Sequence, residues 1–175
     1  MYLGEDSFFL SETLKSHLKS MSREITILDA GSGSGIQAET CLSLDFENIV
    51  CVDTGDEEVK HLKKRFRAVK SDLFSKVKGK FDLIMFNPPY LPENKYDSKP
   101  DTTGGKIGDE TIVSFLDKAR NHLTKKGEIM LLLSSLTPRK RIEKIIESYY
   151  KKTVLAEKRF FFEKLEIWLI RKKVK

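Results

Sequence analysis

Short apolar runs alternate with segments of helical periodicity along most of the chain, and this alternation restricts the possible folds most strongly. The continuous apolar runs are typical of strands buried on both faces and cover residues 25–30, 49–52, 68–70, 81–86 and 128–134. Segments with apolar residues at helical spacing cover residues 10–21, 37–44, 59–66, 112–123 and 142–149. Ser7 is expected to cap the first of these helices. Strand–helix alternation with right-handed crossovers predicts a parallel sheet with helices on both faces.

The last part of the chain breaks this alternation. Residues 154–162 and 165–170 are two strand-like runs with only Glu163 and Lys164 between them for a turn, so they are expected to pair antiparallel. The expected architecture is a three-layer, doubly wound, Rossmann-like α/β fold with a seven-stranded, mostly parallel sheet and an antiparallel C-terminal hairpin strand. Because 175 residues with 39% hydrophobic content can bury a sizeable core, residues 1–175 are expected to form a single domain.

Composition and charge exclude several classes of protein. The formal net charge is +6, but lysine and arginine alternate with acidic residues along the chain, so the charge indicates an anionic partner only weakly. Cys41 and Cys51 lie in apolar segments without the spacing of a zinc site, which predicts reduced core residues and no metal site. Neither a signal-peptide pattern nor an apolar run of membrane-spanning length is present, so a soluble, cytoplasmic protein without membrane contact is expected.

A glycine-rich turn follows the first predicted strand, in the stretch from Leu28 to Gly35. Glycine at Gly31, Gly33 and Gly35 permits a tight turn and lets a ligand approach the backbone closely. An ordinary flexible turn is the alternative, but three regularly spaced glycines between a strand and a helix favour a nucleotide-like ligand. The dinucleotide fingerprint is not met, since Ile36 stands in place of its third glycine, and no P-loop lysine follows. Nicotinamide, flavin and ATP are therefore disfavoured.

Two acidic residues follow the next predicted strands. Asp53 closes the run 49–52, about 20 residues after the glycine turn, where a carboxylate can accept hydrogen bonds from both hydroxyls of a ribose. Asp72 follows the run 68–70 and can accept from the exocyclic amine of an adenine, while Leu73 can cover one face of the ring. Either aspartate alone can also be interpreted as a helix N-cap or a turn residue.

The run 81–86 ends at Asn87-Pro-Pro-Tyr90. Together with the glycine turn and the two acids, this motif resembles the class I S-adenosylmethionine-dependent methyltransferases. In that superfamily an Asn-Pro-Pro-aromatic turn after strand four marks methyl transfer to a planar nitrogen, either an exocyclic base amine or a side-chain amide. The resemblance implies S-adenosylmethionine as the cofactor. Taken alone, the two prolines are also explained as a strand terminator.

The chemistry of a planar nitrogen gives a physical reason for this motif. Its lone pair is delocalised, which makes it a poor nucleophile, so orientation must supply much of the catalysis. Asn87 Oδ1 and the Pro88 carbonyl can each accept one hydrogen from the target NH₂ group, and both hydrogen bonds strengthen as positive charge develops on the nitrogen. Tyr90 is expected to stack on the target group without an acid–base role. Asn87, Pro88 and Tyr90 are therefore the candidate catalytic residues.

Two further stretches, Gly4 to Leu10 and Thr103 to Gly108, resemble the release-factor glutamine methyltransferases of the HemK-like group, in the archaeal and eukaryotic branch. The resemblance covers nearly the whole chain and implies methylation of the glutamine in the Gly-Gly-Gln motif of a class I peptide chain release factor. It implies that Asn87 contacts the substrate amide. The cofactor contacts expected from the resemblance and the glycine turn are Ser7, Asp29, Gly31, Gly33, Gly35, Asp53, Asp72, Leu73 and Asn87.

Relatives in that branch pair the sheet edge at strand three with a small zinc-binding activator protein, which adds its own strand. The resemblance implies such a partner at Phe66 to Lys70. The alternative is that the basic residues of this segment only protect a bare sheet edge from aggregation.

Two other functions stay open. Methylation of an adenine or guanine amine in RNA or DNA would use the same turn and suits the positive charge, but no appended RNA-binding domain is recognisable. A catalytically silent, cofactor-binding subunit of a larger methyltransferase is the third possibility, and the intact Asn87-Pro-Pro-Tyr90 motif argues against it.

Overall fold

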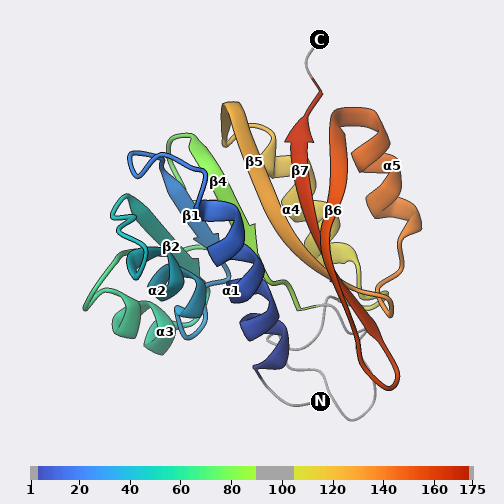
Figure 1. Ribbon diagram of the computed structural model, residues 1–175, viewed down its shortest axis with the longest axis horizontal. Helices are drawn as coiled ribbons and strands as arrows, with labels where there is room; N and C mark the ends of the chain where they lie inside the picture. The colour runs from blue at the N-terminus through green and yellow to red at the C-terminus, as the bar shows by residue number, and fades with distance from the viewer. Residues whose placement is uncertain (1–3, 90–104, 174–175) are drawn as a thin grey trace.

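A seven-stranded sheet with the order β3-β2-β1-β4-β5-β7-β6 forms the centre of the molecule (Figure 1). The computed structural model describes residues 4–89 and 105–173. β7 runs antiparallel to both of its neighbours, and the other adjacent pairs are parallel, which confirms the predicted sheet. The strands are β1 Ile27–Ala30, β2 Ile49–Asp53, β3 Arg67–Lys70, β4 Phe81–Phe86, β5 Leu123–Ser134, β6 Tyr150–Arg159 and β7 Lys164–Lys172.

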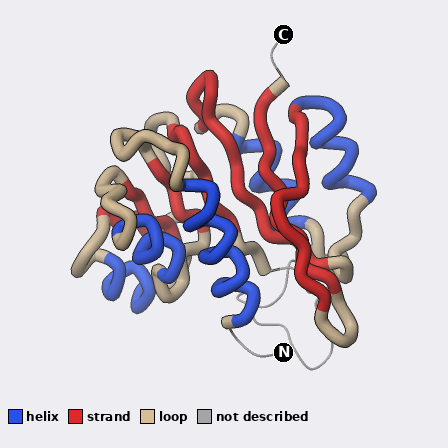
Figure 2. The backbone as a smooth tube through the Cα atoms, in the orientation of Figure 1, coloured by secondary structure: helices blue, strands red, loops and turns tan. Residues whose placement is uncertain are grey.

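Helices cover both faces of the sheet and complete the predicted three layers (Figures 1 and 2). On one face α1, α2 and α3 enclose a core that includes Leu14, Cys41 and Met85. On the other face α4 and α5 enclose a second core with Phe86 and Phe115. Because neighbouring residues of a strand point to opposite faces, Met85 and Phe86 contribute to different cores. The helices are α1 Glu5–Leu18, α2 Ile36–Leu42, α3 Asp56–Leu62, α4 Glu110–Ala119 and α5 Lys140–Tyr149.

The strand register brings the carboxyl ends of the central strands to one edge of the sheet. Ala30 of β1 lies opposite Val52 of β2 and Phe86 of β4, and Asp53 lies opposite Lys70 of β3. The segments that follow these strands therefore emerge side by side. Ligands of doubly wound sheets bind at this edge, which is called the carboxyl edge below.

The first helix begins earlier than the sequence predicts. α1 starts at Glu5, with Gly4 as its N-cap residue at φ 121°, and no side chain caps it. The predicted cap at Ser7 is therefore wrong, because the chain enters the helix through the conformational freedom of Gly4 and Ser7 lies inside the first turn. As a result the Ser7 hydroxyl is free to bind elsewhere in the molecule.

The turn of the C-terminal hairpin also differs from the prediction. The N–H of Phe160 donates to the carbonyl oxygen of Glu163 at 2.8 Å, which leaves Phe161 and Phe162 as the tip. Lys164 already belongs to β7. The prediction of a turn at Glu163 and Lys164 followed the usual preference for polar turn residues, which this hairpin does not obey.

β3 occupies one edge of the sheet, as predicted, and β6 occupies the other. In the part of the chain that the structure describes, no helix combines the length and the apolarity that crossing a membrane requires.

Candidate active site

The glycine turn links β1 to α2 at the carboxyl edge. Gly31, Gly33 and Gly35 all have positive φ, at 62°, 49° and 83°, a conformation that glycine adopts without strain. A Cβ atom placed on Gly33 would meet no heavy atom within 4 Å, so open space borders the turn there. Ser32 fixes the turn, because its hydroxyl donates to the Asp29 carbonyl at 2.7 Å and accepts from the Val52 N–H at 3.0 Å. Ser32 belongs to no motif that marks it as functional in the sequence alone.

Asp53 is tied to the glycine turn by its own carboxylate. Its Oδ2 accepts from the N–H of Gly33 at 2.8 Å, and its Oδ1 accepts from the N–H of Gly55 at 3.0 Å. A carboxylate can accept about four hydrogen bonds, so these two leave capacity for a ribose diol. The carboxylate that was predicted to bind a ribose therefore also holds the turn in shape.

Asp29 is buried beneath the glycine turn with an exposed fraction of 2%. Its Oδ2 atom has no hydrogen-bond partner among the described residues. Burial raises the pKa of this carboxyl to about 7, the backbone N–H of Ala38 opposes the rise, and the charge of Asp53 adds to it. Near neutral pH the side chain is thus poised between its neutral and ionised forms.

Asp72 and Leu73 follow β3 at the same edge. Asp72 is exposed, and Leu73 is half-buried with φ 46°, in the left-handed region that leucine rarely occupies. The Ser71 hydroxyl supports this turn by accepting from the Lys76 N–H at 2.9 Å and donating to the Leu73 carbonyl at 3.1 Å. Backbone strain of this kind concentrates at ligand sites, and the role of Leu73 at the adenine stays a prediction.

Asn87 lies at the end of β4 and is held by the first turn of α1. Its Nδ2 donates to Asp6 Oδ2 at 3.2 Å and to Ser7 Oγ at 3.1 Å. Its Oδ1 is buried and has no hydrogen-bond partner among the described residues. The orientation of the amide is therefore fixed, and its Oδ1 atom is available as an acceptor. The adjacent Pro88 is buried.

Hydrogen bonds between polar residues connect α1 to α2 next to this contact. Gln37 donates to the carbonyl of Ser7 at 2.9 Å and accepts from the Ser11 hydroxyl at 3.1 Å. Ser11 and Gln37 were missed in the sequence. Asp6 lies in the stretch from Gly4 to Leu10 that carries the family resemblance, but it was not among the predicted contacts.

The structure gathers the predicted residues that it describes around the carboxyl edge of the four strands β1 to β4. Ser7 comes from α1, the glycines and Asp29 from β1 and its turn, Asp53 from β2, Asp72 and Leu73 from β3, and Asn87 and Pro88 from β4. Tyr90, the third predicted catalytic residue, lies outside the described residues.

Comparisons with known proteins agree with this geometry. A family model described as the methyltransferase small domain matches residues 6–162. A Methanocaldococcus jannaschii protein, provisionally assigned as a protein N5-glutamine methyltransferase, is 34% identical over 178 residues, which is 94% of this chain and 87% of that protein. A release factor glutamine methyltransferase of Rhodopirellula baltica is 29% identical over 133 residues, which is 63% of this chain and 45% of that protein.

Among solved structures, the Mtq2–Trm112 complex of E. cuniculi contains a similar chain, and that complex is responsible for methylation of the translation termination factor eRF1. The TM-score is 0.79 at 23% sequence identity, over 99% of this chain and 98% of that chain, which shows a common fold. The family model covers most of the chain, and the Methanocaldococcus relative aligns with nearly all of it. The chain is therefore a member of the methyltransferase small domain family.

Proposed function

We propose that this protein transfers a methyl group from S-adenosylmethionine to the side-chain amide nitrogen of the glutamine in the Gly-Gly-Gln motif of a class I release factor. The observation that carries the proposal is the Asn87 amide, which Asp6 and Ser7 fix and whose Oδ1 atom has no partner in the described part of the chain, at the same sheet edge as the glycine turn. The relatives named for protein-glutamine and release-factor methylation support the choice of acceptor.

The residues present fit S-adenosylmethionine. The open space over Gly33 admits a ligand against the backbone, and Asp53 retains acceptor capacity for the ribose. Asp72 and Leu73 would hold the adenine by its amine and its face. The Oδ2 atom of Asp29, for which residues 4–89 and 105–173 provide no partner, suits the positively charged end of the cofactor, because burying an acceptor without a hydrogen bond is unfavourable. When bound, the cofactor supplies an electrophilic methyl group on a positively charged sulfur.

Asn87 would orient the acceptor amide. Its Oδ1 accepts one hydrogen of the target NH₂ group, and the Pro88 carbonyl accepts the other. Asn87 and Pro88 would thereby aim the nitrogen lone pair at the methyl group that the bound cofactor would supply. The carbon–sulfur bond would be the bond broken, its electron pair would remain with the cofactor, and one amide proton would leave for solvent. Both acceptors stabilise the positive charge that develops on nitrogen, which is a larger effect in the transition state than in the bound substrate. Tyr90 retains its proposed role of stacking on the target amide.

The decisive experiment is methyl transfer from labelled S-adenosylmethionine to a purified archaeal-type release factor, with total RNA as a competitor. Label that appears on the release factor and disappears when the Gly-Gly-Gln glutamine is changed to alanine supports the proposal. Label on RNA alone would assign the same site to nucleic-acid methylation. Asn87→Ala is expected to abolish transfer, whereas Asn121→Ala, at an exposed asparagine distant from the motif in sequence, should retain it.

We also propose that a small zinc-binding activator protein pairs with the β3 edge at residues 66–70. β3 is an edge strand of four residues, and Ala68 and Val69 are only half-buried, so an added strand would cover apolar surface. Of the cations near this edge, Arg65 and Lys70 are already paired with Glu39 and Asp56. Co-expression followed by gel filtration tests the pairing, and a monomer that neither binds nor responds to the activator would refute it.

A further inference from the structure

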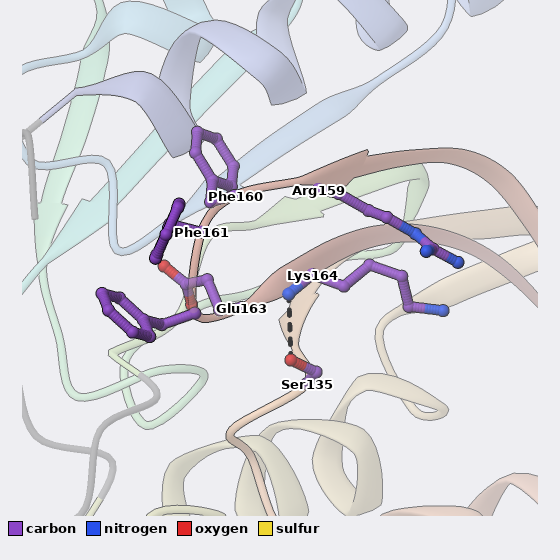
Figure 3. A pocket seen from close by; sticks show the side chains of 7 residues that line it. Ser135, Arg159, Phe160, Phe161, Glu163 and Lys164 are labelled. Carbon is purple, nitrogen blue, oxygen red and sulfur yellow. Dashed lines mark hydrogen bonds between the residues drawn. The ribbon is translucent and has the colours of Figure 1, made fainter.

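Two aromatic side chains project from the tip of the β6–β7 hairpin. The exposed fraction is 94% for Phe161 and 85% for Phe162, the two highest among the exposed large apolar residues. Their rings pack edge to face at a centroid distance of 4.9 Å and an interplanar angle of 72°. The preceding Phe160 packs against the core between the sheet and α1, and Figure 3 shows its ring and that of Phe161 leaving the hairpin in different directions.

Neither ring is required by the turn. Two-residue hairpin loops favour glycine, asparagine or aspartate, and neither Phe161 nor Phe162 has the positive φ that such turns commonly use. The hairpin is closed instead by backbone pairing and by the N–H of Lys164, which donates to the Ser135 hydroxyl at 2.9 Å (Figure 3). A violation of local turn preference without a structural benefit is typical of a functional surface.

The aromatic tip belongs to a larger group of exposed apolar residues at the carboxyl edge. Of the eight large apolar residues that are exposed in the described part of the chain, five lie in segments at this edge. Phe8 lies one residue beyond the Ser7 that holds Asn87, Ile107 precedes α4, and Leu136 follows the carboxyl end of β5. We call this group the apolar rim; it consists of Phe8, Ile107, Leu136, Phe161 and Phe162.

We propose that the apolar rim is the docking surface for the protein substrate, and that Phe161 and Phe162 anchor its surface near the acceptor glutamine. This inference rests on the proposed function. The tip lies two strands from β4, and the register places it roughly 20 Å from Asn87. A single bound protein can therefore contact both the tip and the candidate active site. An open hollow of about 550 Å³ beside the tip, lined in part by Phe161 and Phe162, gives room for substrate side chains.

The charges at this edge favour a protein over a nucleic acid. Asp6, Asp53 and Asp72 surround the candidate active site, where they would repel a phosphate backbone. At the hairpin, Lys164 pairs with Glu157 and Glu166, which offsets part of the positive charge of the exposed Lys158 and Arg159. The edge-to-face contact between the two phenylalanines also hides part of one ring face, which reduces the platform that base stacking needs. An apolar patch on a protein surface, by contrast, matches exposed aromatic anchors.

The test compares the full chain carrying Phe161→Ser and Phe162→Ser with the wild-type chain, each with the candidate activator present. Binding of an intact release factor, measured by calorimetry without any cofactor, is expected to weaken by about 10-fold or more. The KM for methylation of the release factor should rise by a similar factor at nearly constant kcat. A short Gly-Gly-Gln peptide, which cannot reach the tip, should be methylated equally by both proteins.

The double substitution Val154→Ser and Leu155→Ser serves as the matched control, because it removes two exposed apolar side chains from β6 of the same hairpin. It should leave binding unchanged, and circular dichroism should show that all variants are folded. Unchanged release-factor binding in the Phe161/Phe162 variant would overturn the inference. A wild-type chain that does not bind the release factor would overturn it as well. So would a Phe161/Phe162 variant that loses binding to RNA but not to the release factor. Binding without methyl transfer would refute the proposed function and leave the docking surface intact.

Discussion

Asn87 shows how neighbouring residues can decide which end of a side-chain amide faces a substrate. The Nδ2 group of Asn87 donates to Asp6 and Ser7, and a rotated amide would bring its oxygen against the Asp6 carboxylate, which can only accept when ionised. The Oδ1 atom is thereby kept as an acceptor before any substrate arrives. Asp6 and Ser7 act through Asn87 and are therefore positioning residues in the proposed reaction.

Asp6→Ala is expected to lower kcat by about 10-fold to 100-fold, because Asn87 loses one of the two acceptors that orient it. Asp6→Asn keeps an acceptor oxygen and should retain most of the activity. Steady-state kinetics with the release factor measures both effects, and the KM for the cofactor should change little.

The matched control is Glu5→Ala, at the exposed acidic residue next to Asp6 in the same helical turn. It removes a comparable interaction with the helix dipole and should leave kcat unchanged. Equal losses of kcat in the Glu5 and Asp6 variants would contradict the positioning role.

The Asp29 carboxyl predicts a pH-dependent stability. Its pKa rises from 3.8 to about 7 on folding, so between these values the unfolded chain is ionised and the folded chain is not. The free energy of unfolding contributed by this group is therefore highest below 3.8 and falls as pH rises through 7, by roughly 4 kcal/mol in total. Asp29→Asn removes this loss, so its gain in melting temperature over the wild type should be larger at pH 8 than at pH 5.

Thermal unfolding followed by circular dichroism at the two pH values checks this expectation. The variant should bind S-adenosylmethionine more weakly at pH 8, where the wild-type carboxylate is ionised and faces the positive cofactor. A gain in melting temperature that is the same at both pH values would show that Asp29 does not titrate in this range.

At the scale of elements, the sequence predicts best where one physical signal dominates. β4 was predicted with its observed bounds, because an apolar run ends there at Asn87 and Pro88. β5 begins at Leu123, earlier than the predicted residue 128, because Leu123 pairs with Phe81 of β4, and residues 124–127 lie at the register shift before Glu128 pairs with Leu83. The hairpin tip was misplaced because its phenylalanines do not have the properties of turn residues.

The residues of the candidate site also fall into those that a sequence motif marks and those that no motif marks. The glycines, Asp53, Asp72 and Asn87 each lie at or just after the end of a strand in a recognisable motif, and all of them lie at the carboxyl edge, whereas Tyr90 is outside the described residues. Asp6 could not be found by the same reasoning, since it acts on a residue 81 positions away, and sequence periodicity contains no information on that contact. Its contribution became visible only with the packing of α1 against the end of β4.

The glycine turn gives a prediction with an internal control. Gly33→Ala and Gly79→Ala each place a Cβ at a positive φ, 49° and 95°, and in both cases no heavy atom lies within 4 Å. Each substitution is expected to destabilise the fold by about 1–2 kcal/mol through backbone strain. Only Gly33→Ala should also weaken cofactor binding, because only its Cβ enters the space above the turn. Urea denaturation and calorimetry measure the two quantities, and equal cofactor affinities would contradict a ligand at Gly33.

At the scale of the whole molecule, an ion cluster on buried Glu128 of β5 joins α1 to the C-terminal strands. Its carboxylate accepts from Nε2 of His17 on α1 and from Arg171 of β7, whose Nε lies 2.9 Å away. Burial alone would raise the pKa of Glu128, but the hydrogen bonds and charges of His17 and Arg171 outweigh it, so the pKa is lowered. The cluster fixes α1, which carries Asp6 and Ser7, against the far part of the sheet.

Glu128→Gln is expected to destabilise the protein by about 3 kcal/mol at pH 7, because Arg171 and His17 lose the buried carboxylate that they share. The lowered pKa means that the stabilisation by Glu128 is complete above the ordinary pKa of a glutamate and is lost as pH falls through the folded-state value. Urea denaturation between pH 3 and pH 7 should therefore show a flatter acid dependence for the variant. Replacement of exposed Glu147 by glutamine is the control, and an equal effect there would contradict the role of the cluster.

The position of β7 between β5 and β6 has a consequence for the order in which the sheet can assemble. β6 precedes β7 in the chain but has no strand partner until β7 is present, because β7 is its neighbour in the sheet. The two strands are local in sequence and pair rapidly as a hairpin, whereas β5 and β7 must close a longer loop. We therefore expect the hairpin to form first and to dock as a unit, and until it does so a nascent chain would expose the open edge of β5, where association with other chains competes with folding.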